Sequence, residues 1–170
     1  MALIVEDGTV VASAESYLSV SAADTYFAAH GAPATWTGAT SVKENALRMA
    51  TQYLDAVYGG RWRGDRFDDD QVLDWPRENV EIDGVEVEET PLPRVLREAC
   101  AELAHRHLTE TNGLFPDIED TGTVTSESVS AGSVSDSTTW SGGKGKYKRF
   151  SMVEALLSRI LLPVNRAIRS

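Results

Sequence analysis

The sequence Leu47-Arg48-Met49-Ala50-Thr51-Gln52-Tyr53-Leu54-Asp55 decides the fold class of this chain. Apolar residues recur in and around it at the three- and four-residue spacing of a helix, which predicts one buried helix face. That face consists of Ala46, Leu47, Ala50, Tyr53, Leu54 and Val57. The helix is expected to span about residues 42–58, with Ser41 and Glu44 as a capping box at its start and Gly59-Gly60 at its end.

Two tryptophans follow this helix, each beside arginine, in Arg61-Trp62-Arg63-Gly64 and then Gln71-Val72-Leu73-Asp74-Trp75-Pro76-Arg77. Indole and guanidinium faces both stack on nucleic-acid bases, so Arg61 and Trp62 are candidates for a DNA-stacking platform. A structural role is favoured, because a tryptophan at a loop edge more often covers a core while its arginines pair with nearby acids. The residues that we expect to be structural anchors are Arg61, Trp62, Trp75, Pro76 and Arg77.

Three further helices are expected. A short helix opens at Ser21 with Asp24 as a near capping box and ends before Gly31. A longer apolar stripe over about residues 94–111 predicts a second helix. Ser151 with Glu154 forms a capping box that opens a C-terminal helix.

Turn signals add short strands to this fold. Asp83-Gly84 predicts a β-hairpin, and Asp7-Gly8 predicts another over residues 3–11. The expected fold is therefore mainly α, a small bundle of about four helices with a short β-hairpin and a long extended C-terminal arm.

The composition changes sharply after Asp120, because 17 of the 25 residues from 121 to 145 are Ser, Thr or Gly. Such a segment should not fold alone, while its threonines and valines favour an extended strand that borrows the edge of a partner. The predicted organisation is a helical body at 1–120, an extended arm at 121–150 and a docking helix at 151–170.

The net charge of −10 is unevenly distributed. Residues 1–120 hold 9 basic and 23 acidic residues, whereas residues 121–170 hold 7 basic and 3 acidic ones. An acidic body disfavours tight phosphate binding and suits a surface that DNA passes without sticking. A simpler alternative is that the excess acid only keeps the protein soluble.

A basic cluster with interleaved aromatic residues ends the arm. It could contact DNA, dock on an acidic protein surface, or be a solvated linker before an ordinary core helix. The aromatic residues and the apolar helix that follows favour a protein partner. The predicted partner-binding residues are Trp140, Lys144, Lys146, Tyr147, Lys148, Arg149, Phe150, Leu156, Leu157, Ile160 and Leu161.

No catalytic, metal or cofactor motif is recognisable, so we expect a protein that is not an enzyme. His105 and His107 are two residues apart on a helix and face different sides, which excludes an i, i+4 zinc pair. The acidic run at 68–70 lacks the ligand spacing of a calcium loop. The single cysteine, Cys100, is expected to be buried. A membrane span is not expected, because it needs about 20 consecutive apolar residues and the sequence has no such run.

The order of these segments resembles a family of tailed-bacteriophage head-to-tail adaptor, or connector, proteins, some of which are named DnaT-like single-stranded-DNA-binding proteins. The resemblance covers most of residues 15–120. The matching segments are Tyr17, 22–31, 46–55, 61–64, 71–77, 83–84 and 93–104, which follow one another in the same order.

The resemblance implies a ring, usually of twelve copies, between the capsid portal and the tail or its stopper. The expected partners are the portal protein, a tail terminator or stopper protein, and copies of the chain itself. Double-stranded DNA would pass through the channel without sequence-specific binding. The protein would be assembled in the host cytoplasm and lie at the head-to-tail junction of the virion.

The alternative is a replication or packaging accessory that binds single-stranded DNA. It would use Arg61, Trp62 and the cluster from Lys144 to Arg149. Salt-dependent DNA binding would separate the two functions.

Overall fold

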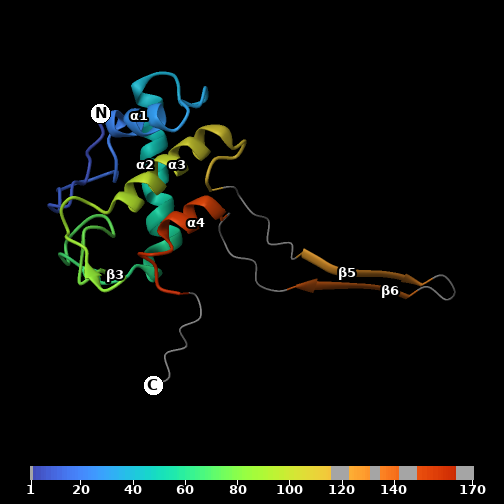
Figure 1. The fold of residues 1–170 in the computed structure, drawn as a ribbon. Helices are drawn as coiled ribbons and strands as arrows, with labels where there is room; N and C mark the ends of the chain where they lie inside the picture. Colours follow the sequence, from blue (N-terminus) through green and yellow to red (C-terminus); the bar gives the residue numbers. More distant parts are fainter. Residues whose placement is uncertain (1, 116–122, 131–134, 142–148, 164–170) are drawn as a thin grey trace. The chain divides into compact units, whose positions relative to one another are not determined.

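The computed structural model describes residues 2–115, 123–130, 135–141 and 149–163 (Figure 1). The chain divides into two compact units. A helical unit contains residues 1–114 and 149–170, and a hairpin unit contains residues 115–148. The fold is mainly α, as the apolar spacing predicts.

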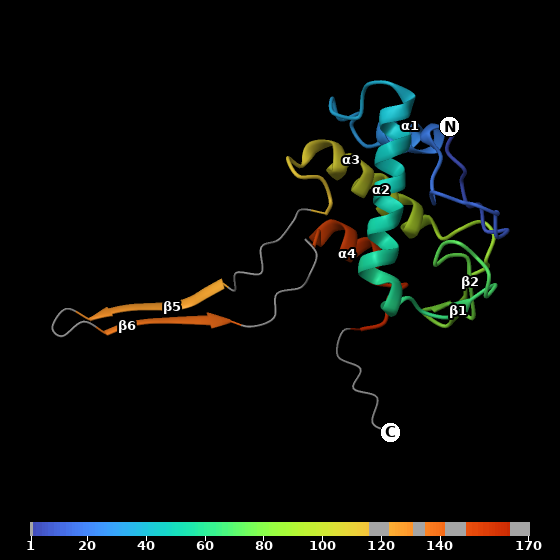
Figure 2. The same ribbon diagram turned by 180° about the vertical axis from the view of Figure 1, so that it is seen from behind.

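The helical unit is built from α1 (Val20–Ala29), α2 (Thr40–Tyr58), α3 (Arg94–Thr109) and α4 (Ser151–Leu157). A short 3-10 turn, η1 (Gly59–Arg61), follows α2 directly. The long α2 crosses α3, and α4 lies against α3 beside the second half of α2 (Figure 1; Figure 2). The core therefore forms where these three helices meet.

The buried faces of α2 and α3 carry the apolar stripes of the sequence. In α2 the buried residues are Ala46, Leu47, Ala50, Thr51, Tyr53, Leu54 and Tyr58. In α3 they are Leu96, Ala99, Cys100, Ala101, Leu103 and Ala104. Burial of an aliphatic side chain contributes roughly 1.5–3 kcal/mol, so these faces supply much of the folding free energy.

The helix starts differ from the expected capping boxes. Ser19, not Ser21, caps α1, and its hydroxyl accepts a hydrogen bond from the Ala22 backbone N–H at 3.1 Å. Neither α2 nor α4 has a side-chain cap. The two glutamates predicted to complete the caps are engaged elsewhere: Glu44 accepts from the Leu3 backbone at 3.3 Å, and Glu154 pairs with an arginine side chain.

Two small antiparallel sheets follow α2. Strand β1 (Asp65–Arg66) pairs with β2 (Arg77–Glu78), and β3 (Glu81–Ile82) pairs with β4 (Val85–Glu86) (Figure 2). The second pair confirms the hairpin predicted at Asp83-Gly84.

The hairpin predicted over residues 3–11 is wrong, because the described part of that segment has no strand beyond an isolated parallel bridge from Val5 to Ser16. The buried carboxylate of Glu6 organises the segment instead, since it accepts hydrogen bonds from main-chain N–H groups. These donors belong to Gly8, Val10 and Val11, at 2.8 to 3.1 Å.

The hairpin unit contains β5 (Thr123–Ser130) and β6 (Ser135–Ser141). The two strands pair antiparallel with each other, with Val124 opposite Trp140 and Val129 opposite Asp136. An arm that pairs first with a partner's edge was expected. Local pairing is favoured here because the two strands are separated by four residues in the sequence.

The C-terminal segment, predicted as a docking helix at 151–170, forms a shorter helix whose apolar side chains pack within the helical unit. Helix α4 ends at Leu157, and the described residues 149–163 belong to the same compact unit as α2 and α3. Four of the proposed docking side chains are at most 7% exposed, namely Phe150, Leu157, Ile160 and Leu161. They complete the core of the body, because the faces of α2 and α3 would otherwise remain open to water.

Candidate functional site

Both tryptophan rings of the predicted anchors are packed inside the helical unit. Trp75 is fully buried, Trp62 is 3% exposed, and their ring centroids lie 5.8 Å apart in an edge-to-face arrangement. The indole N–H of Trp62 donates to Asp74 Oδ2 at 3.2 Å. A base cannot stack on a ring that is covered in this way, so Trp62 is not an exposed DNA platform in this structure.

Arg77 ties the loop between the tryptophans together. Its Nε donates to the Arg63 carbonyl at 2.9 Å, its Nη2 to the Gly64 carbonyl at 2.6 Å, and its Nη1 to the Asp74 carbonyl at 3.3 Å. Gly64 has a φ of +68°, and a Cβ there would lie 2.1 Å from the Glu78 carbonyl oxygen. Only glycine allows this close approach, so Arg77 and Gly64 together fix the path of the chain.

A buried polar cluster connects α2 to the second tryptophan. The Tyr17 hydroxyl donates to Asp55 Oδ1 at 2.5 Å and accepts from the Trp75 backbone N–H at 3.3 Å. The Asp74 backbone N–H lies 3.4 Å from Asp55 Oδ2. Burial raises the pKa of Asp55 to about 7, the nearby Asp74 charge adds to this, and the Tyr17 hydrogen bond opposes it.

No motif in the sequence predicts a role for Asp55. One signal was present, because Asp55 follows Thr51 by four residues along the edge of the apolar stripe of α2. Nothing in the sequence indicates that Tyr17, 38 residues away, supplies its hydrogen bond.

A second site forms where the end of the described chain returns to η1. Trp62 and Leu161 form an antiparallel bridge. The Arg63 N–H donates to the Ile160 carbonyl at 3.0 Å, and the Leu162 N–H donates to the Arg61 carbonyl at 2.7 Å. These bonds hold residues 160–162 against residues 61–63.

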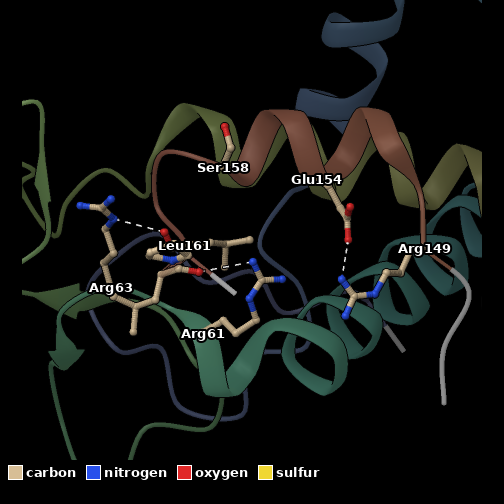
Figure 3. A pocket seen from close by; sticks show the side chains of 8 residues that line it. Arg61, Arg63, Arg149, Glu154, Ser158 and Leu161 are labelled. Carbon is tan, nitrogen blue, oxygen red and sulfur yellow. Dashed lines mark hydrogen bonds and ion pairs between the residues drawn. The ribbon is translucent and has the colours of Figure 1, made fainter. Parts of the chain in front are cut away.

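The arginine pocket, with a volume of about 360 Å³, opens beside this pairing (Figure 3). It is lined by Arg61, Arg63, Arg149, Glu154, Ser158, Leu161, Leu162 and Pro163. Figure 3 shows the guanidinium groups of Arg61 and Arg149 extending toward one another beneath α4. Residues that are 88 positions apart in the sequence are therefore brought to one pocket.

Main-chain carbonyls hold two of the three arginines. Arg61 Nη2 donates to the Leu162 carbonyl at 3.3 Å, and Arg63 Nε donates to the Leu161 carbonyl at 3.3 Å. Arg149 Nη1 lies 3.0 Å from Glu154 Oε1 in an ion pair whose side chains are 53% and 36% exposed. An ion pair this exposed is worth only about 0–1 kcal/mol and can be exchanged for another anion.

The pocket is electropositive in an acidic protein. Three guanidinium groups face one carboxylate there, whereas the whole chain has a net charge of −10. Arg61 Nε is buried and has no hydrogen-bond partner among the described residues. A buried donor without a partner costs roughly 1–3 kcal/mol, so this guanidinium has unused capacity for an acceptor.

The structure thus separates the predicted site residues into groups. Arg61 and Arg149 meet at the pocket, while Trp62, Trp75, Pro76 and Arg77 lie in or against the core. Leu156 is half-buried, and Trp140 lies in β6. Lys144, Lys146, Tyr147 and Lys148 lie outside the described residues. Arg63, Glu154 and Ser158 were not predicted as pocket residues, because no sequence pattern indicates that residues 61–63 pair with residues 160–162.

Other candidate chemistry is limited in the described ranges. Cys100 is buried, and burial raises the pKa of its thiol to about 11. No three His, Cys, Asp or Glu side chains of residues 2–115 and 149–163 lie in an arrangement that could hold a metal ion. Among the helices that the structure describes, none is long and apolar enough to cross a membrane.

Comparison with protein families gives a match over nearly the whole chain. The model of a family described as "Putative DnaT-like ssDNA binding protein" matches residues 1–169. This chain belongs to that family. The DnaT-like family match covers the helical unit and the hairpin unit alike. No curated protein and no solved structure matches the chain.

Proposed function

We propose that this chain is a structural head-to-tail adaptor of a tailed bacteriophage, which forms a ring between the portal and the tail or its stopper. The order of the segments from Tyr17 to residue 104 supports this proposal through its resemblance to known adaptors. The virion would be its location, and portal, stopper and neighbouring copies its partners. No catalysis is part of this role.

The observation that carries the proposal is the separate hairpin unit inserted between α3 and α4. Its strands are 8 and 7 residues long and form a two-stranded sheet with two outer edges. A lone two-stranded hairpin is marginally stable in water, and unpaired strand edges are templates for another chain. A hairpin of this kind gains stability when it pairs with a neighbouring subunit in a ring.

The surface of the body agrees with this role. Residues 1–120 carry 23 acidic and 9 basic residues, and the tryptophans beside arginine are buried. A surface of this charge repels phosphate, which favours passage of DNA over binding.

Size measurement tests the adaptor role. The purified chain should be monomeric or weakly associated alone, and it should form a closed ring with the portal protein of the same phage. Light scattering after size exclusion and negative-stain images provide the readout. A stable ring of the isolated chain would still agree with the role, whereas failure to associate with portal under any condition would exclude it.

A variant sharpens this test. Replacing residues 123–141 by a short Gly/Ser linker should leave the helical unit folded and prevent ring formation. The helical unit contains the described core residues that anchor α2, α3 and α4. If this variant forms normal rings, the hairpin is not needed for ring formation and the proposed role of the hairpin is wrong.

The second candidate is a protein that binds single-stranded DNA in replication or packaging. Two observations favour it: the description of the family to which the chain belongs, and the arginine pocket. Fluorescence anisotropy with a single-stranded oligonucleotide at about 50 and 200 mM salt distinguishes the candidates. Salt-dependent binding without portal association supports the DNA role, and the reverse pattern supports the adaptor role.

A further inference from the structure

We propose that the arginine pocket is the site at which this protein binds the phosphodiester backbone of single-stranded DNA, through Arg61 and Arg149. The proposal rests on the second candidate function and assigns it a site. Two observations support the site: Arg61 and Arg149 line the same pocket, and the Trp62 ring is buried in the core.

Guanidinium groups suit this ligand. A planar guanidinium presents parallel N–H donors that match two phosphate oxygens, and its charge does not titrate. Arg61 has a buried Nε without a hydrogen-bond partner among the described residues, and Arg149 forms an exposed ion pair with Glu154. A phosphate that enters the pocket can therefore replace Glu154 at Arg149 and receive hydrogen bonds from Arg61 at once.

The sequence on both sides of the pocket favours a ligand with repeated negative charge. Lys144, Lys146 and Lys148 lie within five positions before Arg149, and Arg166 and Arg169 lie within six positions after Pro163. No acidic residue occurs in 137–148 or in 164–170. The sequence next to Arg149 and Pro163 therefore contains five cations and no acid, a composition that is typical of chains that bind polyanions.

The apolar part of the pocket favours a single strand over a duplex. Leu162 is 38% exposed and Pro163 is exposed at the rim. The bases of a single strand can be unstacked and contact such a surface, whereas duplex bases are stacked inside. The proposed site binds the phosphates of the DNA backbone and contacts the bases through an apolar rim. It therefore differs from the predicted platform, in which bases would stack on the Trp62 ring.

The test compares two arginines in similar exposed ion pairs. Arg149→Gln removes a pocket cation, and Arg94→Gln removes an arginine that pairs with Glu98 at the start of α3. Both substitutions change the net charge equally. The probe is a fluorescein-labelled oligothymidylate of about 20 nucleotides, long enough to exceed the site of one small domain.

Arg149→Gln should weaken binding roughly tenfold, since a charge-assisted hydrogen bond is lost, and Arg94→Gln should leave binding within about twofold. The slope of log K against log salt should fall by about 0.7 for Arg149→Gln alone, the value for one phosphate contact on a single strand. A double variant, Arg61→Gln with Arg149→Gln, should weaken binding further. Unchanged melting curves show that each variant is folded.

Four outcomes would overturn the proposal. Absence of oligothymidylate binding removes both the site and the DNA function, whereas equal losses for Arg149→Gln and Arg94→Gln remove only the site. A duplex of the same length that binds as tightly and depends equally on Arg149 removes the single-strand preference. Competition by polyglutamate as strong as that by oligothymidylate would indicate an acidic protein partner instead.

Discussion

The segments Trp75-Pro76-Arg77 and Arg61-Trp62-Arg63 both bury an indole ring, but their arginines lie in different surroundings. Arg77 donates to three main-chain carbonyls and joins the two segments. Arg61 donates to the Leu162 carbonyl and lines the arginine pocket, and its Nε has no hydrogen-bond partner in the part of the chain that the structure describes. The comparison teaches that an arginine beside a buried tryptophan is structural when carbonyls occupy its donors and available to a ligand when they do not.

The largest effect should come from removing the segment that builds one side of the pocket. A chain that ends at Lys148 loses Phe150, Val153, Leu157, Ile160 and Leu161, all buried. At about 1.5–3 kcal/mol each, the loss is comparable to the whole stability of a domain, so the truncated chain should not fold.

Circular dichroism and thermal melting of the truncated chain test this expectation. A chain that ends at Pro163 keeps these buried side chains and is the matched control. A cooperative melting curve for the shorter chain would show that α4 is dispensable and that the pocket is built on a separate docking segment.

Truncation of the tryptophans should have the next largest effect. Trp75→Ala should lower the free energy of unfolding by about 3–5 kcal/mol, because a fully buried ring leaves a cavity. Trp62→Ala should cost slightly less, since its ring is 3% exposed. Denaturant titration measures both, with Phe67→Ala, at 48% exposure, as a control near zero. Unchanged stability of Trp62→Ala, with weaker DNA binding, would restore the stacking platform.

The stability of the Trp75-Pro76-Arg77 segment should depend on pH, because Asp55 contacts Tyr17 and the Asp74 backbone beside Trp75. Its pKa rises from 3.8 to about 7 on folding, so the native state holds the extra proton between these values. The free energy of unfolding should therefore fall as pH rises from about 4 to about 7, by up to about 4 kcal/mol.

Chemical denaturation at several pH values measures this fall. Asp55→Asn carries no charge at any pH and should remove most of the dependence. Below pH 4 the trend reverses, since hydrogen bonds lower the pKa of Glu15 and Asp24, and their stabilisation is lost as pH falls. The same slope in Asp55→Asn as in the native sequence would contradict this assignment.

The smallest effects should separate the arginines directly. Arg77→Gln leaves carbonyls of Arg63, Gly64 and Asp74 without a donor and should cost about 1–3 kcal/mol. Arg149→Gln removes an exposed ion pair and should cost less than about 1 kcal/mol. Differential scanning calorimetry of both variants gives the comparison. If the two substitutions lower the free energy of unfolding equally, Arg149 stabilises the fold as much as Arg77 does.

The helical part of the fold could be predicted because its signals are local. The apolar residues of α2 recur within one turn of each other, and Gly84 follows Asp83 directly in its hairpin. The capping boxes could not be predicted from the same kind of pattern. Glu44 and Glu154 satisfy the spacing, but distant or preceding groups, Leu3 and Arg149, compete for their carboxylates.

The sequence by itself determined the mainly helical class, the buried faces of α2 and α3, and the division of charge between body and tail. These depend on side-chain spacing and composition, which the chain carries without any tertiary contact. Only the tertiary structure decided that the apolar face of the last helix belongs to the core and that Arg61 and Arg149 share a pocket. Both outcomes require segments about 90 residues apart in the sequence to pack together. The spacing of apolar residues predicts which face of a helix is apolar, but it does not predict which segment will cover that face.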